Sequence, residues 1–306
     1  MNGQLMRNAR QRRSATSRQI HLFTSELRRM VQSPWFVGAL IILTLLAIIS
    51  AHLDHLSYSE WAGFAREYGN KNYGMENRVM IGSWVGTDRK PSSGLFAFLL
   101  PLLCLLPGAG SLIEERSSGY QAHALSRVTD GAYYRSKAAA CFLTGGLTAA
   151  LPLLLSCLMA AAVTPYGHPS PLGYLSLSIP IASNTPFSTL YFSDPLMYMS
   201  IWIGIAFFLC GFWATAVLGA SLFVSSPIRL YVGAFILQII LNHIAYSINM
   251  LFFQSEMSTV DLFTLLIPSG FETGSAQIGA LLICLFALTF TSIILPLFFF
   301  KRRCYL

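Results

Sequence analysis

Few residues of this chain have the type and spacing that catalysis, nucleotide binding or metal binding requires. No lysine follows a glycine, so the sequence lacks the G-x-x-x-x-G-K-[ST] loop that holds nucleotide phosphates. The H-E-x-x-H zinc motif and the G-x-S-x-G nucleophile motif are missing as well. His52, Asp54 and His55 lie close together, but two histidines and one carboxylate are a weak metal signal. We therefore expect no catalytic, metal or cofactor site, and we expect that the protein is not an enzyme.

Polar side chains inside apolar sequence concentrate in the segment 230–253. Gln238, Asn242 and Asn249 recur at a spacing that places them on one face of a helix. His243 lies beside Asn242 and is the only titratable group deep in this apolar sequence. Two interpretations remain open. The polar groups form hydrogen bonds between helices, each worth about 0.6 kcal/mol, or they line a transport pathway.

The composition is that of an all-α polytopic membrane protein. Of its 306 residues 54% are hydrophobic and 11% charged, with a mean hydropathy of +0.57. A soluble domain carries about 25% charged residues. Six segments approach the roughly 20 apolar residues that span a bilayer, and none contains Asp, Glu, Lys or Arg. The predicted spans are Phe36–Leu53, Leu95–Ile113, Ala138–Val163, Leu196–Val224, Leu230–Phe253 and Ala276–Phe300, within a transmembrane domain of residues 36–306.

The positive charges predict the orientation of these spans. Fifteen of the 20 Lys and Arg residues lie on the side of the two termini. The other five are Arg66, Lys71, Arg78, Arg89 and Lys90. Because cytoplasmic loops carry the excess of positive charge, we expect both termini in the cytoplasm. The net charge of +7 then reflects topology and contact with lipid headgroups, and we expect no nucleic-acid partner.

Two predicted cytoplasmic elements flank the first spans. Residues 1–35 form a tail and an amphipathic helix, Thr16–Val31, whose apolar residues recur at helical spacing and suit the headgroup region. Ser33-Pro34 then breaks the helix and allows a sharp turn into the membrane. In the loop Glu114–Lys137, Tyr120–Val128 is predicted to be a short helix. That helix is either a docking element for a partner or part of a solvated connector.

This arrangement resembles the permease subunits of ABC-2 type exporters. Residues similar to the family's pattern are Glu115, Gly119, Leu125, Ser126, Arg127, Val128, Tyr134 and Lys137. The helix Thr16–Val31 looks like the family's elbow helix, and Pro268-Ser269-Gly270 is similar to part of its short outer helices. The resemblance implies a multi-pass protein of a prokaryotic cell membrane. Such a permease pairs with a second permease subunit, identical or different, and docks a separate ATP-binding subunit.

For this chain, the resemblance implies that the ATPase subunit docks on the loop Glu114–Lys137. The expected docking residues are Glu115, Gly119, Tyr120, Leu125, Arg127 and Val128. The absence of charged residues from the predicted spans disfavours an ion-coupled transporter, which leaves energy supply to a partner. The alternatives are a six-span assembly or signalling protein without transport activity, and an ion-coupled secondary transporter. Whether the cargo is a peptide, lipid, drug or glycan stays open.

Overall fold

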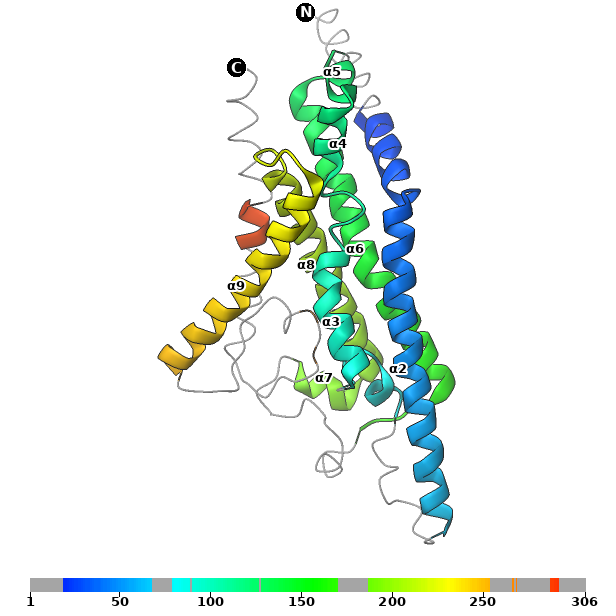
Figure 1. Ribbon diagram of the computed structural model, residues 1–306. Helices are drawn as coiled ribbons and strands as arrows, with labels where there is room; N and C mark the ends of the chain where they lie inside the picture. The colour runs from blue at the N-terminus through cyan, green and yellow to red at the C-terminus, as the bar shows by residue number, and fades with distance from the viewer. Residues whose placement is uncertain are drawn as a thin grey trace, which may run out of the picture.

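A computed structural model describes residues 19–67, 79–88, 90–126, 128–169, 187–253, 266, 268 and 287–291. All regular structure in these ranges is helical (Figure 1). Residues 19–31 and 287–291 are helical, and the other elements are α2 (Pro34–Glu67), η1 (Met80–Ser83), α3 (Pro91–Leu103), α4 (Ser111–Ser117), α5 (Tyr120–Leu125), α6 (Asp130–Val163), α7 (Ser188–Ser193), α8 (Pro195–Ala220) and α9 (Pro227–Phe253). The expected all-α class is therefore confirmed for the described part of the chain.

Three of these helices are long and apolar enough to cross a membrane. They are α6, α8 and the part of α2 from Pro34 to Phe64. They coincide with the first, third and fourth predicted spans and indicate a membrane protein. The fifth predicted span corresponds to α9, whose part from Pro227 to Leu241 counts as a shorter apolar helix. The sixth predicted span lies largely outside the described residues.

The second predicted span, Leu95–Ile113, is wrong as a single helix. Helix α3 ends at Leu103, a turn occupies 104–110, and α4 begins at Ser111. Pro107 in this turn has no backbone N–H to donate. Gly110 approaches its neighbours closely, since a Cβ there would lie 2.6 Å from the Tyr231 hydroxyl oxygen. The turn thus joins two short helices.

The first span is longer than predicted and nearly continuous with the helix before it. Helix α2 runs on to Glu67, well past the predicted end at Leu53. Only Gln32 and Ser33 separate it from the helical residues 19–31. The backbone N–H of Phe36 donates to the Ser33 hydroxyl over 3.2 Å, which caps the start of α2. In Figure 1 the segment 19–31 continues along the line of α2, without the sharp turn expected at Ser33-Pro34.

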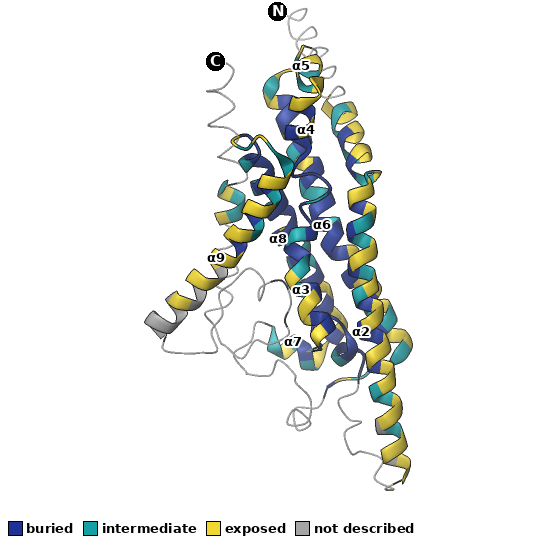
Figure 2. Ribbon diagram, viewed as in Figure 1, coloured by how far each residue is buried: buried dark blue, intermediate teal, exposed yellow. Residues whose placement is uncertain are grey.

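Helices α6 and α8 form the centre of the bundle and pack through small residues. A Cβ on Gly211 of α8 would lie 2.8 Å from the Phe142 carbonyl oxygen, and one on Gly146 of α6 would lie 2.7 Å from the Phe207 ring. Glycine therefore lets the two backbones approach closely. Figure 2 shows buried residues concentrated along α6 and α8, whereas α2 and α9 expose long apolar faces. Helix α9 diverges from the bundle in Figure 1.

The bundle end that carries α7 is closed by the segment 79–88. Trp84 is 1% exposed and donates its indole N–H to the Leu153 carbonyl of α6 over 3.2 Å. Asp88 accepts hydrogen bonds from the hydroxyls of Ser50 (2.7 Å) and Ser93 (3.1 Å). This contact ties α2 to the start of α3. The opposite end carries α4 and α5 and is called the α5 end below.

Candidate functional site

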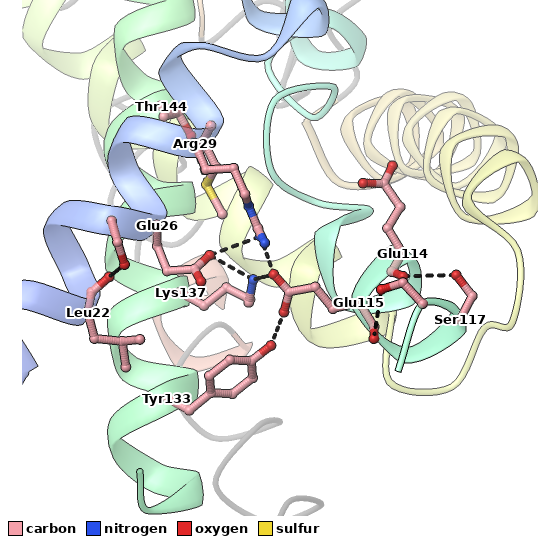
Figure 3. Close-up of polar contacts among 12 residues, drawn as sticks. Leu22, Glu26, Arg29, Glu114, Glu115, Ser117, Tyr133, Lys137 and Thr144 are labelled. Carbon is pink, nitrogen blue, oxygen red and sulfur yellow. Dashed lines mark hydrogen bonds and ion pairs between the residues drawn. The ribbon is translucent and has the colours of Figure 1, made fainter. Parts of the chain in front are cut away.

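Charged side chains from three elements meet at the α5 end and form what we call the charge cluster (Figure 3). Its members are Glu26 and Arg29 from the segment 19–31, Glu115 from α4, and Tyr133 and Lys137 from α6. Glu115 closely follows the apolar run that ends at Ile113, and Lys137 directly precedes the apolar run of α6. The three elements are far apart in the sequence and are joined here by ion pairs.

Lys137 is the centre of the charge cluster. Its side chain is 0% exposed, and its ammonium lies 2.9 Å from a Glu26 oxygen and 2.6 Å from a Glu115 oxygen. Both carboxylates are themselves buried. A lysine can be buried only when its charge is paired and its donors are satisfied, and the two carboxylates meet both needs.

Arg29 and Tyr133 complete the network around the two carboxylates. Arg29 lies 3.0 Å from Glu26 and also pairs with Glu115. The buried Tyr133 donates its hydroxyl hydrogen to the other oxygen of Glu115. Two cations thus balance two anions, which makes burial of the whole set tolerable. The cluster locks the segment 19–31, α4 and α6 to one another.

The structure places the expected docking helix next to this cluster. Helix α5 spans Tyr120–Leu125 and follows Gly119, whose φ of 74° is left-handed and favours glycine. Tyr120 is 48% exposed, and its ring lies 6.0 Å from the Arg29 guanidinium carbon. Leu125 and Val128 are half-buried. A short helix in this loop is therefore confirmed, and Tyr120 is its most accessible expected anchor.

Another expected docking residue, Glu115, is buried instead of accessible to a partner. Glu115 is 4% exposed and fully engaged by Lys137, Arg29 and Tyr133, so it supports α4 from within. The accessible carboxylate of this helix belongs to the neighbouring Glu114. Arg127 lies outside the described residues.

The polar face expected on α9 is described in part. Gln238 is 1% exposed and points into the protein, and its amide nitrogen has no hydrogen-bond partner among the described residues. His243 is exposed and lies five residues further along α9. The side chains of Asn242 and Asn249 lie outside the described set. The structure therefore supports an inward-facing polar position at Gln238 and does not group it with His243.

A cleft of about 520 Å³ opens beside the charge cluster. Its lining comes from both sides of the Ser33 break, the 104–110 turn, α4, α5 and the start of α9. The lining residues are Arg29, Met30, Ser33, Trp35, Leu106, Pro107, Ser111, Glu114, Glu115, Ser118, Tyr120 and Tyr231. The cleft thus combines aromatic rings, hydroxyls and carboxylates where the helices enter apolar surroundings.

Sequence reasoning missed the charge cluster, although one signal pointed to it. In the sequence, Glu26 lies within the predicted amphipathic helix Thr16–Val31, and Lys137 stands only among the residues similar to the family's pattern. Glu26 and Lys137 are 111 positions apart, so no local pattern links them. The available signal was the position of opposite charges at the ends of apolar runs, where a lone charge is costly.

Comparison with known proteins yields no match to a family model, a curated protein or a solved structure. Over the described residues, the helices are those of an all-helical membrane protein. A proposal for its function therefore depends on the sequence and geometry of the chain itself.

Proposed function

We propose that this chain is the transmembrane permease subunit of an ATP-driven exporter of the ABC-2 type. Two permease subunits, identical or different, form the substrate pathway, and each docks a separate ATPase subunit in the cytoplasm. The observation that carries the proposal is the connection between α5 and the bundle. A short, exposed helix is attached through α4 to a buried ion-pair network that reaches α6.

This connection is what energy transfer from a partner requires. Because Glu115 pairs with Lys137 and Arg29, a displacement of α4 moves the charged ends of α6 and of the segment 19–31 with it. A docking helix on a free linker would not transmit force in this way. The lack of a phosphate loop fits the proposal, since ATP would be bound by the partner subunit. The buried Gln238 is the pathway position that the structure favours.

The test is removal of the docking contacts without damage to the fold. Leu125→Ala combined with Arg127→Glu should strip the ATPase subunit from the complex purified from native membranes. Truncation of an anchor should cost about 1–2 kcal/mol of binding free energy, and reversal of a charge should cost more when the contact is desolvated. Expression should stay near that of the unaltered protein, and thermal stability should fall only slightly, because Leu125 is half-buried at the edge of the core and is not a member of the charge cluster.

The control is Ser117→Ala in α4, since within the part of the chain that the structure describes the Ser117 hydroxyl bonds only the Glu114 carbonyl of its own helix. It should keep the partner. If the double variant retained both the ATPase subunit and transport-stimulated hydrolysis, α5 would be a solvated connector. If no ATPase subunit copurifies with the unaltered chain, the result favours the alternative function, a membrane assembly or signalling protein without transport activity.

A further inference from the structure

The cleft at the α5 end carries an inference that goes beyond the exporter proposal. We propose that it binds the headgroup of phosphatidylethanolamine from the membrane leaflet at that end of the bundle. The ammonium of the lipid lies against Glu114, Ser111 and the aromatic rings, and its phosphate lies against Arg29.

The position of the cleft favours a lipid. Lys137 directly precedes the apolar run of α6, so the charge cluster marks the boundary between polar headgroups and apolar tails. The cleft shares Arg29 and Glu115 with that cluster and therefore opens at the same level. The exposed apolar residue Trp35 lines it and is 60% exposed. Indole rings favour this interfacial depth.

The polar groups of the cleft that have no partner among the described residues favour the binding of an ammonium group. Glu114 is exposed, lines the cleft, and its carboxylate makes no ion pair with a described residue; Figure 3 shows it pointing away from the charge cluster. Ser111 is only 8% exposed, yet its hydroxyl has no hydrogen-bond partner within the described part of the chain. A buried hydroxyl without a partner costs free energy, which a bound donor recovers.

The aromatic residues and Arg29 refine the choice of headgroup. Trp35, Tyr120 and Tyr231 line the cleft, and aromatic faces attract cations. A primary ammonium also donates hydrogen bonds to a carboxylate and a hydroxyl, which a trimethylammonium cannot do. Arg29 keeps a side chain that is 43% exposed and can donate to a phosphate next to the ammonium. A zwitterion with a primary amine satisfies both ends of the cleft.

The volume of the cleft fits this occupant. About 520 Å³ lies within the range of roughly 300–1,000 Å³ that is usual for small-molecule sites. A phosphoethanolamine group fills part of that space, and the acyl chains extend past Trp35 into the bilayer.

The test is lipid binding to the purified full chain, without any partner, measured by native mass spectrometry. Phosphatidylethanolamine, phosphatidylcholine and phosphatidylglycerol with the same acyl chains are titrated separately. Phosphatidylethanolamine should bind about three- to tenfold more tightly than the other two. Glu114→Gln should remove this preference, and Trp35→Ala should weaken binding of phosphatidylethanolamine. The matched control is Glu67→Gln, an exposed carboxylate at the far end of α2, which should change nothing.

Two results would overturn the lipid site. One is equal binding of the three lipids, or tighter binding of phosphatidylglycerol, which would indicate an anion site at Arg29. The other is a preference for phosphatidylethanolamine that persists in Glu114→Gln. Because no ATPase subunit takes part in this measurement, its failure leaves the exporter proposal standing, and the reverse also holds.

Discussion

Lys137 and the two carboxylates beside it set the energetics of the α5 end. A fully buried ammonium is tolerated because the carboxylates of Glu26 and Glu115 lie next to it and pair with its charge. Arg29 adds positive charge from a partly exposed position and so contributes less per contact than Lys137. The cluster therefore acts through one buried residue, and removal of that residue should matter more than removal of any exposed charge nearby.

Lys137→Met should lower the free energy of unfolding by about 3–5 kcal/mol, because it leaves buried carboxylates without their main cation. Thermal unfolding of the purified protein in detergent measures the effect. Arg135→Met is the control, since the Arg135 side chain is exposed and, among the described residues, bonds only the Gly131 carbonyl of its own helix. An unchanged unfolding temperature for Lys137→Met would show that the cluster does not stabilise the protein.

Neutralising the three buried charges should restore much of the loss, while Arg29 keeps its charge in a partly exposed position. In the combination of Glu26→Gln, Glu115→Gln and Lys137→Met no uncompensated buried charge remains at Lys137. We expect this triple variant to unfold at a higher temperature than Lys137→Met alone. If it unfolds at a lower temperature, each pair contributes separately and the charges do not act as one network.

Among the elements, the sequence predicted the apolar helices and could not predict their interruptions or their partners. The run 195–220 was recognised because its length and composition alone require a span. The break at 104–110 was missed because Leu105 and Leu106 keep the sequence apolar through Pro107 and the flanking glycines. The pairing of Glu26 with Lys137 depends on tertiary contact, which no local pattern predicts. The short helix α5 was predicted from a local signal, the glycine before it.

The close contact between helices α6 and α8 can be tested by substitution of a glycine at the contact. Gly211→Leu should destabilise the bundle by at least 1–3 kcal/mol, since a Cβ at this position meets the backbone carbonyl of Phe142 at 2.8 Å. Gly204→Leu in the same helix is the matched control, because nothing lies within 4 Å of a Cβ there. Comparable unfolding temperatures for the two variants would contradict the close approach of the helices.

For the whole molecule, the two bundle ends should face opposite sides of the membrane. Single cysteines at Tyr166 and at His123, in a background without the six natural cysteines, report the two ends. An impermeant maleimide added to intact cells should label Tyr166→Cys and leave His123→Cys unlabelled, as the distribution of Lys and Arg predicts. Disruption of the cells should make His123→Cys reactive. Labelling of His123→Cys in intact cells would reverse the orientation and remove α5 from the cytoplasm.

The order of residues along the chain gives the charge cluster a consequence for biosynthesis. Glu26 and Glu115 leave the ribosome before Lys137, which follows Glu115 by 22 positions and Glu26 by 111. Until α6 arrives, the ion pair between Arg29 and Glu115 is the only charge-cluster contact that can join α4 to the segment 19–31, and Arg29 is partly exposed to water. The arrival of Lys137 adds α6 to these two elements and supplies the buried cation for both carboxylates. A nascent chain that ends before this lysine therefore lacks the centre of the charge cluster, and assembly of the α5 end waits for α6.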